Sequence, residues 1–146
     1  MTKVAAVCVD ASVGAKWFLP DESDGPAARA LLEGYVLGQL NIVVPDLFFY
    51  EVGNLLSVAV RRGWLPERVA LQSLEELERL HLETISPLGE MDSALAFSRR
   101  LGLSFYDAAY LAAAERRGLP LVTCDEKLRR AVAPVLSWVV SPAAVG

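Results

Sequence analysis

Short apolar runs rich in β-branched side chains recur along the chain. The first, Val4–Val9, is uninterrupted and ends at Asp10. A run without polar alternation is typical of a strand that is buried on both faces. The same pattern predicts further strands at residues 42–44, 121–123 and 138–140.

Between these runs the apolar residues recur at helical spacing. Pro66 is an ordinary first residue of a helix, and Gly102 and Gly118 are typical helix stops. Strands that alternate with helices predict a parallel sheet wrapped by helices. The predicted helices cover residues 26–37, 46–62, 66–80, 91–101 and 105–117, and a last one begins near Asp125.

No linker, repeat or low-complexity segment interrupts this alternation. The densest turn cluster, Pro20–Pro26, reads as a surface loop within one domain. A chain of 146 residues also has the size of one domain with its own core. We therefore predict a single α/β domain over residues 1–146.

Composition and charge narrow the class of protein. Hydrophobic residues make up 53% and charged residues 22%, which excludes intrinsic disorder. A net charge of −4 argues against bulk attraction to nucleic acid. No apolar run approaches the ~18 residues of a membrane span, and Val4–Val9 is short for a signal-peptide core of about 7–15 residues. We expect a soluble cytoplasmic protein with reduced thiols and no membrane partner.

Four acidic residues stand out by their positions. Asp10 and Asp125 follow the first and third predicted strands, whose carboxyl ends meet at the edge of a parallel sheet where ligands bind. Asp107 falls in the first turn of a predicted helix. Glu51 has apolar neighbours one turn to either side, and an ionised carboxylate is seldom buried without a partner.

Each of these carboxylates also has a structural interpretation. Asp10 would cap a short helix that begins near Ser12. Ser104–Asp107 and Thr123–Glu126 both fit the spacing of a capping box, with Glu126 as the reciprocal partner, and Glu51 would pair with an arginine. Capping explains each aspartate alone, but not why two aspartates end strands at one edge.

Clustered carboxylates repel, and one must take up a proton unless a cation neutralises the group. A cluster of oxygen donors without histidine or thiolate suits Mg²⁺ or Mn²⁺ and argues against zinc. Two such ions activate a water and stabilise the leaving oxygen of a phosphodiester. The carboxylates therefore indicate metal-assisted hydrolysis of a phosphate ester.

Other chemistries have little support in the sequence. A single histidine, His81, lies near the end of a predicted helix, which argues against a Ser-His-Asp triad. Cys8 and Cys124 lie in or beside apolar strands and read as structural. There is no glycine-rich nucleotide-binding motif, so a nucleotide cofactor is not expected.

Eight of the fourteen basic residues occur as arginine pairs near the predicted ends of helices. At a helix C-terminus each charge gains about 0.3–1 kcal/mol from the helix dipole. The other interpretation is contact with the phosphates of a substrate strand. The pairs are Arg61-Arg62, Arg99-Arg100, Arg116-Arg117 and Arg129-Arg130.

Four segments resemble the motifs of a known family, and they extend from residue 4 to residue 128 in the expected order. They resemble PIN-domain ribonucleases, most closely the toxin subunits of VapBC-type toxin–antitoxin pairs. The segments are Val9–Val13 with Lys16–Phe18, Pro45 with Glu51–Leu56, Ser104–Tyr110, and Leu121–Leu128.

The resemblance implies a three-layer α/β/α sandwich and an acidic metal pocket of Asp10, Glu51, Asp107 and Asp125. Asp10, Asp107 and Asp125 would be the main ligands, and Glu51 would bind a second ion or a metal water. Cys124 stands where smaller residues are more usual. The polar residues that the resemblance assigns to support of the pocket are Ser12, Asn54, Ser104 and Thr123.

The resemblance also implies activity and partners: endonucleolytic RNA cleavage with Mg²⁺ or Mn²⁺, a cognate antitoxin protein and a homodimer. Two alternatives stay open, a PIN-type nuclease that processes RNA or cuts DNA without an antitoxin, and a catalytically weak module that binds RNA or protein. The candidates for an interface, which the domain's own core would equally explain, are Phe48, Phe49, Leu56, Val60 and Trp64.

Overall fold

A computed structural model describes residues 5–19 and 23–145. Its core is a sheet of five parallel strands in the order β3–β2–β1–β4–β5. The strands are β1 (Ala5–Val9), β2 (Leu40–Pro45), β3 (Glu83–Ile85), β4 (Leu121–Val122) and β5 (Val139–Val140).

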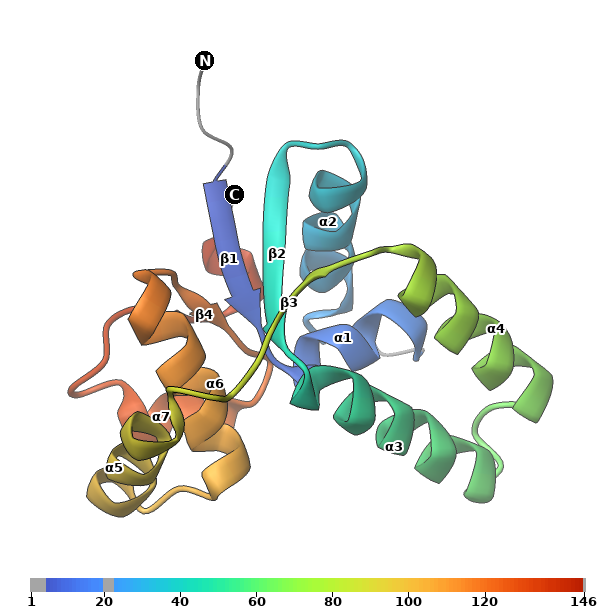
Figure 1. Ribbon diagram of the computed structural model, residues 1–146. Coiled ribbons are helices and arrows are strands. Elements are labelled where there is room, and N and C mark those ends of the chain that lie inside the picture. The colour runs from blue at the N-terminus through green and yellow to red at the C-terminus, as the bar shows by residue number, and fades with distance from the viewer. Residues whose placement is uncertain (1–4, 20–22, 146) are drawn as a thin grey trace.

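Helices cover both sides of this sheet (Figure 1). On one side α6 packs against β1, β2 and β4, and α5 packs against α6. On the other side α2 and α3 contact β2, α1 packs against both of them, and α4 packs against α3. The predicted three-layer α/β/α sandwich is confirmed. The helices are α1 (Ala11–Phe18), α2 (Gly25–Val36), α3 (Leu47–Arg61), α4 (Glu67–Arg79), α5 (Met91–Leu101), α6 (Phe105–Arg117) and α7 (Glu126–Val132), followed by the short 3₁₀ helix η1 (Pro142–Ala144).

One strand was not predicted. β3 has only three residues, pairs with β2 alone and is mostly exposed. A short edge strand carries no continuous apolar run, so its sequence looks like a loop. Two predictions lie partly outside the described residues: Val4 of the first predicted strand, and residues 20–22 of the predicted surface loop.

Glycine allows α1 and α3 to pack closely. A Cβ on Gly14 would lie 2.6 Å from the Phe48 ring and 2.9 Å from Val52 Cγ2. Phe48 and Leu56 are fully buried, so they belong to the core. Of the predicted interface residues, Trp64 remains 64% exposed.

Most predicted helix ends are confirmed. Gly102 and Gly118 end α5 and α6 with left-handed φ angles of 66° and 63°, as expected for C-terminal glycines. Pro66 is the residue before the first turn of α4 and not its first helical residue. The arginine pairs all lie at or near the C-terminal ends of α3, α5, α6 and α7.

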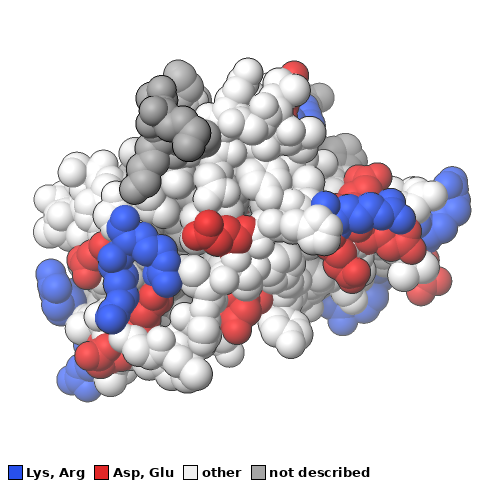
Figure 2. Space-filling model, turned by 45° about the horizontal axis from the view of Figure 1, so that its top comes forward, with Lys and Arg blue, Asp and Glu red and all other residues white. Residues whose placement is uncertain are grey.

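Charged side chains gather over two ends of the face shown in Figure 2, one on the α4 side and one on the α5–α7 side. In both groups basic and acidic residues are mixed, and between them acidic side chains interrupt an otherwise uncharged surface. The basic residues therefore do not merge into one band across this face. Within the described residues, no helix has the length and apolar character that a membrane span requires.

Candidate metal-binding active site

The sheet brings the ends of β1 and β4 together. Cys8 pairs with Leu121 and Val9 with Val122, so the residues that follow both strands lie at one edge. Asp10 ends β1 and caps α1, where its carboxylate accepts from the backbone N–H groups of Ser12 and Val13. The prediction that Asp10 caps a short helix is confirmed.

Asp125 follows β4 and caps α7. Its carboxylate accepts from the Leu128 N–H at 3.0 Å. The sequence predicted a capping box that starts at Thr123, and this is wrong: Thr123 is fully buried and lies two residues before the cap. Its hydroxyl instead accepts from the Asp125 N–H at 3.0 Å.

Ser12 links these two aspartates through Thr123. The Ser12 hydroxyl donates to the Asp10 carboxylate and accepts from the Cys124 N–H at 2.8 Å. The Thr123 hydroxyl lies 3.2 Å from Ser12 Oγ. Because a hydroxyl carries one hydrogen and that of Ser12 is directed to Asp10, Thr123 donates to Ser12. The loops after β1 and β4 are thereby held in fixed relative positions.

Glu51 reaches the same site from α3. The Tyr110 hydroxyl of α6 donates to Glu51 Oε1 at 2.6 Å. The expected pairing of Glu51 with an arginine is therefore wrong, and its partner is a tyrosine whose side chain is almost fully buried. Burial and the neighbouring Glu51 charge raise the pKa of Tyr110 above its usual value, so its hydroxyl stays protonated and donates.

Asp107 enters the site from the first turn of α6. Ser104 caps this helix, and its hydroxyl accepts from the Asp107 N–H at 3.1 Å, as predicted. Tyr110 lies three residues after Asp107, which places both on the same side of α6. This spacing is the sequence signal that would have identified Tyr110 as part of the site.

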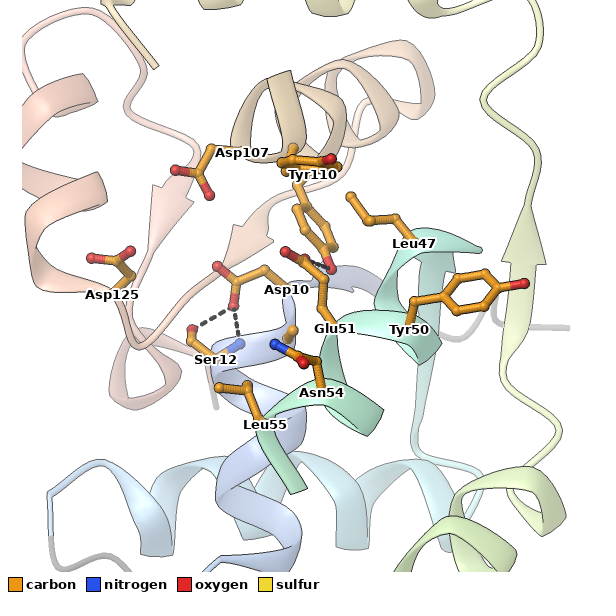
Figure 3. A pocket seen from close by; sticks show the side chains of 12 residues that line it. Asp10, Ser12, Leu47, Tyr50, Glu51, Asn54, Leu55, Asp107, Tyr110 and Asp125 are labelled. Atoms are coloured by element: carbon orange, nitrogen blue, oxygen red, sulfur yellow. Dashed lines mark hydrogen bonds between the residues drawn. The ribbon is translucent and has the colours of Figure 1, made fainter. Parts of the chain in front are cut away.

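All four carboxylates line one open pocket of about 360 Å³. In Figure 3, Asp107 and Asp125 point toward each other, Asp10 lies between them and Glu51, and Asn54 lies beside Glu51 on α3. Of the predicted residues, Ser104 and Thr123 support the site from outside the lining. The lining consists of Asp10, Ala11, Ser12, Leu47, Tyr50, Glu51, Asn54, Leu55, Tyr106, Asp107, Tyr110 and Asp125.

Burial and the neighbouring carboxylates raise the pKa values of three of these four groups. Burial, with a smaller contribution from the charge of Asp107, raises the pKa of Asp10 to about 6. Burial and then the Asp107 charge raise the pKa of Glu51. Burial and then the Asp125 charge raise the pKa of Asp107. Asp107 is thus the shared neighbour of the other three carboxylates.

The donor set fits a hard divalent cation. The lining contains four carboxylates, one amide and one serine hydroxyl, and it contains no lysine or arginine. In the described part of the chain, no three acidic, histidine or cysteine side chains lie together in a way that could hold one metal ion. An open arrangement suits Mg²⁺, which keeps several waters and takes one or two protein carboxylates.

The two cysteines do not contribute a nucleophile. Both are free, and burial raises the pKa of Cys8 and of Cys124 to about 12. Both thiols therefore stay protonated at neutral pH, and the thiolate is the reactive form.

Comparisons with known proteins agree with this architecture. A family model described as PIN domain matches residues 7–133. A protein from Pyrobaculum aerophilum named Ribonuclease VapC3 is 38% identical over 122 residues, which are 82% of this chain and 89% of that protein. A second from the same organism, Exonuclease VapC9, is 31% identical over 76% of this chain and 82% of its own length.

Solved structures share the fold. The crystal structure of PAE2754 from Pyrobaculum aerophilum has a TM-score of 0.73 and 25% identity, and the match covers 97% of this chain and 86% of that one. A toxin–antitoxin complex from Klebsiella pneumoniae has a TM-score of 0.63 and 18% identity, with coverage of 93% and 97%.

Proposed function

The chain belongs to the PIN domain family, with VapC proteins as its relatives, and on this premise we propose that it is an Mg²⁺-dependent endoribonuclease. One observation carries the proposal. Four carboxylates from four separate segments line one pocket that has no basic lining residue. Such a concentration of negative charge needs a cation before it can approach the phosphates of RNA.

We assign the metal to Asp10, Asp107 and Asp125, with Glu51 on a second ion or on a metal water; Mn²⁺ is an alternative to Mg²⁺. Bound there, the cation supplies an activated water and neutralises charge on the phosphodiester. Ser12 and Thr123 hold the Asp10 and Asp125 loops in register. Tyr110 holds the Glu51 carboxylate at the pocket.

The relatives also support a role and partners. We propose that the chain is the toxin of a toxin–antitoxin pair, that it acts in the cytoplasm, and that it forms a homodimer. The VapC names of the relatives and the fold shared with a solved toxin–antitoxin complex support the antitoxin partner.

The test is cleavage of total RNA by purified protein with Mg²⁺, Mn²⁺ or chelator. Asp107→Asn serves as the control for contaminating nuclease, because Asp107 neighbours all the other carboxylates. We expect discrete metal-dependent fragments that the variant does not produce. Cleavage that survives Asp107→Asn, or RNA binding without cleavage in every metal, contradicts the proposal, and the latter favours the binding-module alternative.

Two substrates refine the result. A circular RNA has no ends, so its cleavage separates an endonuclease from the exonuclease activity that one relative's name states. A single-stranded DNA of the same sequence tests the alternative that the substrate is DNA. We expect the circular RNA to be cut and the DNA to remain intact.

A further inference from the structure

A second, mainly apolar pocket of about 180 Å³ adjoins the carboxylate pocket. The two pockets share Leu47 and Tyr106 as lining residues, so a ligand in one lies directly beside the other. The second pocket lies between the end of β2, the start of α5 and the first turns of α6. Its other apolar lining residues are Pro45, Pro87, Met91, Ala94, Phe105 and Ala109, with Ala112.

Several of these side chains are exposed although they are apolar. Tyr106 is 61% exposed, Met91 49% and Phe105 37%. Two of the lining residues are aromatic and two are prolines, so much of the wall is made of rings. Exposed aromatic side chains beside a nuclease site are suited to stacking on the flat face of a base.

Two carboxylates, the exposed Asp46 and the buried Glu90, lie in this otherwise apolar lining. The side chain of Glu90 is only 8% exposed, and its Oε1 accepts from Arg117 at 2.6 Å. Together with the bond from Arg116 to the Gly89 carbonyl, this pair ties α6 to the start of α5. The pair occupies Oε1, and a carboxylate has further acceptor sites.

The lining therefore combines rings with two carboxylates that only accept hydrogen bonds. An aliphatic protein side chain would bring no donor to the acceptor sites of Glu90 that Arg117 leaves open. A base with an exocyclic amino group offers both a flat apolar face and an N–H donor. Acidic side chains recognise such amino groups, as in the contact of Asp or Glu with cytosine N4.

We propose that this pocket binds one unpaired nucleobase of the RNA, namely a base with an exocyclic amino group. Tyr106 stacks on the base and Glu90 accepts from its amino group, while the adjoining phosphate reaches the carboxylate pocket. The proposal rests on the proposed ribonuclease function and adds a sequence preference at one position beside the cut. Adenine, cytosine and guanine are accepted there, and uracil is disfavoured because carbonyl groups flank its N–H.

The sequence offers a direct probe of binding. It contains two methionines, Met1 and Met91, so protein labelled with ¹³C in the methionine methyl groups gives one signal from the pocket, assigned with Met91→Leu. The ligands are AMP, CMP, GMP and UMP with Mg²⁺, because nucleoside monophosphates contain no phosphodiester to cleave. We expect the Met91 signal to shift with AMP, CMP and GMP more than with UMP, and the Met1 signal to stay.

Variants test the two contacts separately. Tyr106→Ala and Ala109→Leu, which fills the pocket, abolish the shift, and Tyr106→Phe retains it. Glu90→Gln, which adds an N–H donor, reduces the difference between UMP and the other nucleotides. Trp64→Ala is the matched control, since Trp64 is an equally exposed aromatic side chain outside both pockets.

Cleavage of a randomised single-stranded RNA pool gives the second readout. Wild type shows a deficit of uracil at one position beside the cut, and Tyr106→Ala abolishes this deficit. A stacking contact of normal strength predicts that Tyr106→Ala raises KM by roughly 5- to 150-fold. We expect kcat to change less than KM, because Tyr106 binds the base and not the metal.

The outcomes separate this proposal from the proposed function. A shifted Met91 signal without any RNA cleavage supports the base pocket and contradicts the nuclease. RNA cleavage with an unmoved Met91 signal and unchanged cut positions in Tyr106→Ala overturns the base pocket and leaves the nuclease intact. A change of oligomeric state in Ala109→Leu, with no effect on nucleotide shifts, shows that a second copy covers the pocket and also overturns it.

Discussion

The carboxylate pocket has two walls that are held in different ways. On the strand wall, which carries Asp10 and Asp125 after β1 and β4, backbone N–H groups and the Ser12–Thr123 hydroxyl pair fix the side chains. On the helix wall, Glu51 of α3 accepts one hydrogen bond, from Tyr110. Asp10 is 5% exposed, whereas Glu51 is only half-buried. The strand wall is therefore held by several hydrogen bonds, whereas Glu51 on the helix wall is held by its hydrogen bond from Tyr110 and is more exposed.

The largest expected effect comes from the strand wall. Asp10→Asn keeps the shape and a capping oxygen but removes the charge of a proposed ligand. Loss of a side chain that only supports a ligand typically costs 10- to 100-fold, so we expect more than about 100-fold loss of RNA cleavage. Cleavage rates of variant and wild type, measured side by side with Mg²⁺, check this.

The stability of the Asp10→Asn variant is the control for its expected loss of activity. Burial disfavours the charged form of Asp10, so an uncharged amide does not destabilise the metal-free fold. We expect Asp10→Asn to unfold at the same or a higher urea concentration than wild type in chelator. Lower stability would mean that lost activity reflects unfolding and not a missing ligand.

On the helix wall, Tyr110→Phe removes one hydroxyl and leaves the ring in the core. Without its donor Glu51 is less well placed, and we expect a roughly 10- to 100-fold loss of activity. The lost hydrogen bond lowers the free energy of unfolding by about 1 kcal/mol. Glu51→Gln and the double variant complete the cycle: if Tyr110 acts through Glu51, the double variant is no worse than Glu51→Gln.

Stability against pH reports on the charge of the strand wall. The folded pKa of Asp10, about 6, lies above its ordinary value, so the folded state binds the proton more tightly than the unfolded state. The free energy of unfolding therefore falls as pH rises from about 4 to about 6, by up to about 3 kcal/mol. Urea denaturation in chelator across this range checks the sign.

Repeating the pH series with added Mg²⁺ tests whether the ionised carboxylates cause this fall in the free energy of unfolding. The pKa values of Glu51 and Asp107 are also raised, so their contribution has the same sign. A cation that binds the ionised pocket should restore stability above pH 6, by about 2.7 kcal/mol at 100 times its Kd. A pH profile that is the same with Mg²⁺ and with chelator would contradict a metal site here.

A further variant tests the contact that joins the two walls. Gly14 lies in α1, which Asp10 caps, and packs on α3, which carries Glu51. In Gly14→Ala the new methyl group meets the Phe48 ring, and overpacking of this kind costs about 1–3 kcal/mol. We expect a lower unfolding midpoint and weaker Mg²⁺ binding. Ala15→Gly, in the same helix, is the control for a general loss of helix stability.

The features that the sequence predicted correctly are mostly those whose sequence pattern spans only a few neighbouring residues. Apolar runs predicted the buried strands, and glycines predicted the ends of α5 and α6, because those signals lie within a few residues. β3 was missed because an edge strand needs only one partner strand and little apolar sequence. The acidic residues were found through sheet topology and motif resemblance.

Contacts between residues that lie far apart in the sequence could not be predicted from the sequence. The Glu51–Tyr110 hydrogen bond joins residues on two helices on opposite sides of the sheet, so neither segment alone predicts it. The prediction that Thr123 starts the capping box of α7 failed for a similar reason. Thr123 contacts Ser12, which is far away in the sequence, and Asp125 caps the helix instead. The apolar pocket beside Tyr106 likewise depends on how α5 and α6 pack.

The pairing of β1 with β4 has a consequence for the order in which a newly made chain becomes complete. Asp10 and Asp125 are far apart in the sequence, so the strand that precedes Asp125 docks beside β1 only after the long segment between them has been made. A nascent chain that has not yet reached β4 and Asp125 thus lacks half of the strand wall.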